Sequence, residues 1–262
     1  ASDLLADFIR GPLEAFYAEQ GVDLVLEDIG SLPALDRLRS DEIDLAIIAS
    51  PDGQTVPRDE FTIYPFAYDA AVIAVNESNP IDEISLAFLG GIFGANEEFN
   101  FNTWGELGLS GWGNRNIKPL TGVESESIAL ELFRHSVLGG GAMKPSVAMV
   151  QSDEVSGMVE ADAASIAVFS RPPQSGELKV LMLSVGEDAP AFGPSEDNIH
   201  YGDYPVRLPF YIAFNARDEA KVNGLVRVLL DDAVAAALAE NGLFPLPETV
   251  RRQFLIDFDL TR

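Results

Sequence analysis

Residues 66–80 read FAYDAAVIAVNESNP, and this run decides the fold. The run is apolar, yet it is too polar at its start and too short to span a membrane. β-Branched residues at positions 72, 73 and 75 favour a buried strand over a helix, and Asn79-Pro80 ends it. A second run of the same character, LPFYIAFN at residues 208–215, follows a long stretch of α/β pattern. A chain that leaves one lobe on the first strand and returns on the second would have this layout.

The composition excludes several classes of function. The chain has 262 residues, of which 47% are hydrophobic, so it can bury a sizeable core. Its 42 acidic and 17 basic residues give a net charge of −25. Nucleic acids and anionic membranes are therefore not expected as partners, because both require a Lys/Arg surface. The acidic surface is either an adaptation for solubility, including solubility at high salt, or a means of recruiting cations or basic partners. The absence of cysteine excludes disulfides and thiolate metal sites and fits an exported bacterial protein.

The first lobe is predicted to contain helices and a parallel sheet. Its expected helices lie at residues 1–9, from residue 30 onward, at 218–240 and at 248–258, and its expected strands at 22–29 and 43–51. Pro12 is expected to kink or break the first helix near Gly11. The order strand–helix–strand predicts parallel pairing with right-handed crossovers.

The second lobe is predicted to alternate helices and short strands. Helices are expected at residues 85–93, at 152–160 and after residue 127, and strands at 116–120, 165–169 and 178–183. The apolar residues of the helix after 127 fall on one face, and Gly139-Gly140-Gly141 ends it. Residues 94–116 are expected to be irregular, and residues 185–203, which are rich in Gly, Pro and acids, are expected to form a loop.

Three short segments share one design, in which small hydroxyl residues stand at a helix N-terminus. They are Ser2-Asp3-Leu4, Gly30-Ser31-Leu32 and Ser125-Glu126-Ser127. A helix N-terminus offers unpaired N–H groups and a partial positive charge, which together favour a small oxyanion. In open α/β sheets such turns meet at the carboxyl edge of the strands. The alternative is that each Ser or Asp is an ordinary N-cap without a ligand.

Four tracts lie in order along the chain: ISLAFLGGIFG at 84–94, NTWGELG at 102–108, YPVRLPFY at 204–211 and NGLFPL at 241–246. Together they resemble the phosphate-binding proteins of ABC transporters, the PstS-like family. The strand ending VNESNP is followed by ISLAFLGGIFG at 84–94 and NTWGELG at 102–108, similar to that family's "L-x-x-L-x-x-I-F-x-G … N-W-x-x-L-G". YPVRLPFY at 204–211 resembles its "Y-P-x-x-R-P-L-Y" return strand, and NGLFPL at 241–246 resembles its "x-G-Y-x-P-L". These landmarks span nearly the whole chain.

The resemblance implies a type II periplasmic-binding-protein fold of class α/β, with two lobes joined by two crossing strands and a cleft between them. Lobe one would comprise residues 1–70 plus 206–262, and lobe two residues 71–205. It also implies a strand before the first helix. The implied function is capture of phosphate or a related small oxyanion for an ABC transporter permease. The protein would be periplasmic or extracellular, with no chemistry done on the ligand. A monomer is expected, without cofactor or metal.

This chain departs from the family's ligand contacts at two places. The family's loop before the third helix has a pattern like "G-R-E-x-G-S-G-T", and the corresponding residues of this chain are Gly122 to Ile128. Val123 replaces the arginine and Glu126 replaces a glycine, whereas Ser127 retains the serine. Glu124 and Glu126 would repel an anion unless one accepts a hydrogen bond from a protonated ligand; alternatively they are favourable acids in a first helical turn. After the third strand, the tract Ile48-Ala49-Ser50-Pro51 keeps only a serine of the family's pattern, and Ala49 stands where the family has a charged contact.

Other residues are weaker candidates for ligand contacts. Tyr68 and Asp69 on the crossing strand are expected to face the cleft, although Tyr68 also suits hinge packing. Arg115 and Lys118 could replace the missing arginine, or they could be solvated surface charges. The tryptophans suit core packing better than ligand stacking, and the two histidines lack partners at metal-ligand spacing.

Two rival functions remain open. In the first, the same fold has lost phosphate binding and serves another small ligand or a protein partner, which the missing arginine supports. In the second, the chain is an enzyme on the same scaffold, with Glu124 or Glu126 near Asp69 as an acid–base pair. The fold alone does not decide between them.

Overall fold

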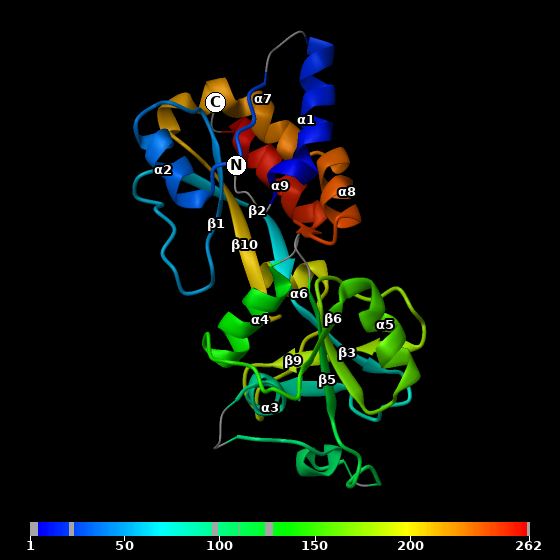
Figure 1. Ribbon diagram of the computed structural model, residues 1–262. Helices are drawn as coiled ribbons and strands as arrows, with labels where there is room; N and C mark the ends of the chain where they lie inside the picture. Colours follow the sequence, from blue (N-terminus) through cyan, green and yellow to red (C-terminus); the bar gives the residue numbers. More distant parts are fainter. Residues whose placement is uncertain (1–4, 21–23, 96–98, 110, 124–127, 261–262) are drawn as a thin grey trace. The chain divides into compact units, whose positions relative to one another are not determined.

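The structure is a computed structural model that describes residues 5–20, 24–95, 99–109, 111–123 and 128–260. The chain forms two compact units, each built from helices and strands (Figure 1). Unit 1 comprises Ala1–Asp69 and Leu208–Arg262, and unit 2 comprises Ala70–Arg207. The α/β class predicted from the sequence is confirmed in both units. None of the helices in the described part of the chain combines the length and apolar character needed to cross a membrane.

Unit 1 contains a four-stranded sheet in the order β1-β10-β2-β11. The strands are Ala46–Ala49, Arg207–Phe214, Thr62–Ala70 and Phe244–Pro245, respectively. β1 pairs with β10 in antiparallel fashion, and so does β11 with β2. The parallel pairing predicted for β1 is therefore wrong. Residues 24–30 form no strand, so the expected strand at 22–29 is not beside β1, and β1 pairs with the returning strand instead.

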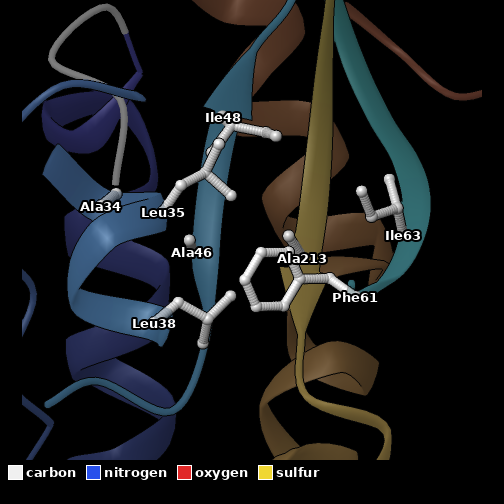
Figure 2. Close-up of a cluster of buried hydrophobic side chains, with 8 residues drawn as sticks. All are labelled: Ala34, Leu35, Leu38, Ala46, Ile48, Phe61, Ile63 and Ala213. Atoms are coloured by element: carbon white, nitrogen blue, oxygen red, sulfur yellow. The ribbon is translucent and has the colours of Figure 1, made fainter. Parts of the chain in front are cut away.

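Helix α2, Ser31–Arg39, covers one face of this sheet. Its buried side chains meet those of β1, β2 and β10 in one apolar cluster, which Figure 2 shows with the side chains of the helix directed toward the strands. The cluster consists of Ala34, Leu35, Leu38, Ala46, Ile48, Phe61, Ile63 and Ala213. Full burial of a leucine or isoleucine side chain contributes about 1.5–3 kcal/mol, so this cluster holds α2 firmly in place.

The opposite face of the sheet packs against the C-terminal helix α9, Glu248–Leu260. The ring of Tyr64 on β2 stacks with Phe214 on β10, with centroids 6.1 Å apart, and meets Phe254 of α9 edge-on at 5.5 Å. Ile63, the neighbour of Tyr64, belongs to the α2 cluster. Because successive side chains of a strand point to opposite faces, α2 and α9 lie on opposite sides of the sheet.

Two helix predictions in unit 1 are corrected. Helix α1, Ala6–Gln20, continues through Pro12, so the helix is not broken there, and the kink expected as the alternative stays a prediction; α1 packs against α7 and α8. The single helix expected at 218–240 is two helices, α7, Glu219–Leu229, and α8, Asp232–Glu240. The side chain of Asp231 accepts a hydrogen bond from the N–H of Ala233 at 2.9 Å, which caps a new helix and ends the continuous pattern.

The extended residues 24–30 are held by arginines rather than by a strand ladder. Arg37 of α2 forms an ion pair with Glu27, and the second nitrogen of its guanidinium donates to the other oxygen of that carboxylate at 3.2 Å. The hydrogen bond from Arg37 lowers the pKa of Glu27. Arg10 of α1 donates to the carbonyl oxygen of Leu26 at 3.3 Å. These contacts position the turn that begins α2.

Unit 2 contains a five-stranded sheet in the order β6-β5-β7-β3-β8. The strands are Ala148–Gln151, Lys118–Val123, Ser165–Phe169, Val72–Asn76 and Leu178–Val180, respectively. β5 runs parallel to β6 and β7, whereas β3 is antiparallel to β7 and β8. A smaller parallel sheet joins β4, Glu83–Ser85, to β9, Met182–Ser184.

Helices flank the sheet of unit 2. They are α3, Leu86–Phe93; α4, Ala129–Leu138; α5, Ser152–Ala161; and α6, Glu196–Tyr201, with the short 3-10 helix η1, Trp104–Leu107. α3 meets α4 through an edge-on contact of Phe93 and Phe133, whose centroids are 5.0 Å apart. The prediction of a loop throughout 185–203 is wrong, because Ser195 accepts from the N–H of Asn198 and caps α6 within it.

The connection from β2 to β3 is tied to the segment before β10. The long strand expected from residue 66 onward is divided at Ala71, whose N–H donates to the carbonyl oxygen of Val206 at 3.1 Å. The hydroxyl of Tyr204 donates to the carbonyl oxygen of Ala71 at 2.8 Å. Tyr204 is fully buried, and burial raises the pKa of its phenol far above the usual range. The outgoing and returning segments of the chain are therefore bonded to each other.

Candidate functional site

The start of α2 presents a set of hydrogen-bond donors. Gly30, the N-cap residue, has φ 76° and ψ 169°, a conformation that glycine adopts without strain, and it supplies no side-chain cap. The first helical bond runs from the N–H of Ala34 to the carbonyl of Gly30 at 3.2 Å. Pro33 has no N–H, so the amides of Ser31 and Leu32 are the donors that precede it. Neither has a hydrogen-bond acceptor among the described residues.

The hydroxyl of Ser31 joins α2 to the end of β1. Its oxygen accepts a hydrogen bond from the N–H of Ala49 at 2.8 Å. The next residue, Ser50, is buried and donates its N–H to the carbonyl of Pro209 on β10 at 3.0 Å. Because the Ser31 oxygen is used as an acceptor, its hydroxyl hydrogen remains to be donated to a ligand. Two backbone amides and one hydroxyl therefore lie together at the start of α2.

The end of β2 lies at the same edge of the unit 1 sheet. β2 is the neighbour of β10, and the bond from Ala71 to Val206 joins the end of the one to the start of the other. Tyr68 and Asp69 are both buried there, with 3% and 7% of their surfaces exposed. Tyr68 is also paired with Phe244 of β11. We call Gly30, Ser31, Ser50 and Asp69 the unit 1 rim.

The structure thus brings Gly30, Ser31, Ser50, Tyr68 and Asp69 to one edge of one sheet. The remaining predicted contacts lie outside the described residues; these are Ser2, Asp3, Leu4, Glu124, Ser125, Glu126 and Ser127. The role of every one of these residues as a ligand contact stays a prediction. Sequence reasoning missed the bond between Ser31 and Ala49, for which the local sequence carries no signal.

The two cations proposed to replace the missing arginine have other partners. The guanidinium of Arg115 lies over the ring of Trp112, 4.2 Å from its centroid. Lys118 forms an ion pair with Asp162. In unit 1, carboxylates likewise lie within ion-pair distance of Arg10, Arg37, Arg39, Arg217, Lys221, Arg251 and Arg252. The donors identified at the start of α2 are two backbone amides and one hydroxyl, which are neutral groups.

Other features of the described residues do not form a competing site. Trp104 is fully buried and donates its indole N–H to the carbonyl of Ala164 at 3.0 Å, so it anchors the core. The described residues contain no group of His, Asp and Glu that could hold a metal ion. A cavity of about 410 Å³ in unit 2 lies between α3 and α4, and its described lining, including Phe99 and Val137, carries no charged side chain. That lining does not suit a small anion.

Comparisons with known proteins agree with the fold. The model of the PBP superfamily domain matches residues 2–233. The phosphate-binding protein PstS of Pseudomonas aeruginosa is 25% identical over 209 residues, which cover 76% of this chain and 64% of that protein. The chain thus matches less than two thirds of the length of this curated relative. That relative is named as a phosphate-binding protein.

Solved structures show the same architecture. A possible phosphate-binding protein from Planctomyces limnophilus has a TM-score of 0.71 at 18% identity, with 98% of this chain and 96% of that chain covered. PstS from Borrelia burgdorferi has a TM-score of 0.74 at 15% identity, with 94% and 97% covered. Because the family model matches residues 2–233, most of the chain, and the structure has the two α/β units, the chain belongs to the PBP superfamily.

Proposed function

We propose that this chain is an exported solute-binding protein that captures phosphate or a related small oxyanion for an ABC transporter. The observation that carries the proposal is the Ser31 hydroxyl. It is fixed by the N–H of Ala49 and stands beside the amides of Ser31 and Leu32, which have no acceptor within the described part of the chain. Preorganised neutral donors at a helix N-terminus bind an anion without a guanidinium. The PstS relative and the phosphate-binding structural neighbours support the same ligand class.

The test is isothermal titration of the purified chain with phosphate, with arsenate and sulfate as comparison anions. We expect a Kd in the micromolar range or tighter, which corresponds to about −8 kcal/mol or better. Ser31→Ala removes one donor and should weaken phosphate binding about fivefold to tenfold. It should also lower the free energy of unfolding by about 1–2 kcal/mol, since the N–H of Ala49 loses its acceptor.

Ser40→Ala is the matched control. Ser40 is an exposed residue at the other end of α2, and its hydroxyl bonds to the carbonyl of Asp36 at 3.2 Å and to Glu42 at 3.0 Å. Its replacement should change the Kd for phosphate by less than about twofold. If Ser31→Ala and Ser40→Ala change the Kd for phosphate equally, Ser31 is not a ligand contact.

A second function retains the fold but not the ligand. Val123 stands where the resemblance places an arginine, which favours a PBP domain that binds another small ligand or a protein partner. If the titrations with phosphate, arsenate and sulfate give no heat of binding, this second function is favoured over the first. A guanidinium restored at this position, Val123→Arg, would then produce phosphate binding only if the remaining contacts are intact.

A further inference from the structure

We propose that unit 2 has a second binding site, in the cavity between α3 and α4, for a small apolar molecule that carries an amine at one end. The cavity measures about 410 Å³, within the range of about 300–1,000 Å³ that is usual for small-molecule sites. Its described lining belongs entirely to unit 2 and shares no residue with the start of α2. This inference therefore goes beyond the proposed function and does not depend on it.

The walls of the cavity are held in place by contacts within unit 2. The two helices pack together through the edge-on rings of Phe93 and Phe133. Past the ends of both helices, the N–H of Ala95 donates to the carbonyl of Ala142 at 2.9 Å. Because these contacts join α3 to α4 and also join the segments that follow them, the cavity is formed before any ligand binds.

The lining favours an apolar ligand. It consists of aliphatic side chains, one aromatic ring and several small residues, and its described members include no hydroxyl, amide or charged side chain. The ring is that of Phe99, which is 54% exposed, and Ala87 and Ala142 are exposed as well, so the cavity opens to solvent. A ligand that covers these groups removes apolar surface from water, which stabilises the complex.

One polar backbone group faces this apolar space. Val137 lies in the last turn of α4, and the N–H of Gly141, its regular helical partner, donates instead to the carbonyl of Leu138 at 2.9 Å. The carbonyl oxygen of Val137 therefore has no donor in the part of the chain that the structure describes. It lies 3.5 Å from the position that a Cβ on Gly90 would take, and both residues line the cavity. A free acceptor at a helix C-terminus, where the helix dipole is negative, favours an ammonium group.

Gly90 keeps the space beside this carbonyl open at a cost to α3, since glycine inside a helix is less stable than alanine. Its neighbour Gly91 has a steric reason to be glycine, because a Cβ there would lie 2.3 Å from the ring of Phe101. Gly90 has no such reason: 3.5 Å is an ordinary contact distance, and its φ is not positive. A methyl group at position 90 would fit the protein, but it would occupy the place beside the acceptor.

The charged residues near the cavity do not oppose an amine. Arg134, one turn before Leu138 on α4, forms an ion pair with Glu131, and Lys144 donates to the carbonyl of Phe101 at 3.0 Å. The net charge of −25 raises the local concentration of cationic ligands at low salt. That attraction is not specific to the cavity, so the test is made at about 0.15 M ionic strength, where it is screened.

The probe is phenethylamine, with phenethyl alcohol and hydrocinnamate as molecules of similar size whose end groups are neutral and anionic. Each is titrated into the isotope-labelled full chain, and binding is followed by the NMR signals of backbone amides. We expect the signals of Gly90, Gly94 and Gly141 to shift with the amine, with a Kd on the order of 1 mM. The alcohol should bind at least about threefold more weakly, and hydrocinnamate should give no saturable shift.

Gly90→Ala tests the cause. It should raise the urea concentration of half-unfolding, because alanine is the better helix former, and yet weaken phenethylamine binding about threefold to tenfold, which corresponds to the loss of one hydrogen bond. Gly157→Ala is the matched control. Gly157 is exposed within α5, and no other described group lies within 4 Å of the position of its missing Cβ. The control should raise the same urea concentration and leave the Kd unchanged.

The remaining outcomes overturn the proposal. An equal Kd for phenethylamine in Gly90→Ala and Gly157→Ala would place the amine elsewhere, as would shifts scattered over the acidic surface. Hydrocinnamate binding as tightly as phenethylamine would refute the assigned ligand class, and the absence of saturable binding by all three probes would refute the site. None of these results bears on the phosphate titration, because the two sites share no residue.

Discussion

Replacing Tyr204 by phenylalanine tests whether the bonded crossing segments stabilise the protein. The substitution keeps the buried ring and removes one hydroxyl, so no large cavity forms. The carbonyl of Ala71, a residue with no exposed surface, loses the hydrogen bond of 2.8 Å that it accepts from this hydroxyl. A buried acceptor left without its donor costs about 1–3 kcal/mol. With a central value of about 2 kcal/mol, Tyr204→Phe should lower the Tm by about 4–8 °C for a chain of this size.

Urea unfolding followed by circular dichroism, with calorimetry for the Tm, measures this difference. Tyr201→Phe is the matched control, since Tyr201 is 69% exposed and its ring contact with His200 survives the change. The control should remain within about 0.5 kcal/mol of the unchanged protein. If Tyr204→Phe and Tyr201→Phe unfold at the same urea concentration, the hydroxyl bond contributes nothing and the reasoning is refuted.

Two further predictions concern the core and an acid-sensitive contact. Leu38→Ala in the α2 cluster should cost about 2–5 kcal/mol in urea unfolding, whereas Leu32→Ala, at a side chain 75% exposed, should cost less than about 0.5 kcal/mol; similar costs would contradict the packing described. The N–H groups of Asn102 and Thr103 donate to Glu106 and lower its pKa below the ordinary 4.5. A lowered carboxyl pKa gives stability that is present above the ordinary value and is lost as pH falls through the folded-state pKa. Below pH 4.5, the unfolding free energy of Glu106→Gln should therefore fall less steeply than that of the unchanged protein. Urea titrations at several pH values measure this difference. An identical fall in both proteins would exclude this contact as a cause of acid sensitivity.

Local signals in the sequence were sufficient to predict most helices and the turn at Gly30 and Ser31 that begins α2. Gly30, Ser31 and Pro33 together indicate a helix start with free donors, and that start forms as expected. The bond between Ser31 and Ala49 spans 18 residues and depends on how α2 packs against β1. No local pattern encodes this packing, so the direction of the hydroxyl could not be predicted.

The failed predictions share a physical cause. Residues 22–29 have the apolar character of a strand, but a strand exists only where another strand accepts its hydrogen bonds, and residues 24–30 have arginine side chains as partners. The helix expected at 218–240 has an unbroken apolar face, yet the side chain of Asp231 accepts a hydrogen bond from the N–H of Ala233, and a new helix starts there. In each case one side-chain contact outweighed a regular pattern.

The strand order of unit 1 has a consequence for synthesis on the ribosome. β10 lies between β1 and β2, but it is made only after the whole of unit 2 has been translated. At about 5–20 residues per second, the nascent chain waits roughly 7–27 s between β2 and β10. During that time the first two strands have no central partner, while the continuous segment of unit 2 is already complete. Unit 2 can therefore fold first as the chain emerges, and β1 and β2, although they are made earlier, complete their sheet only after β10 has been made.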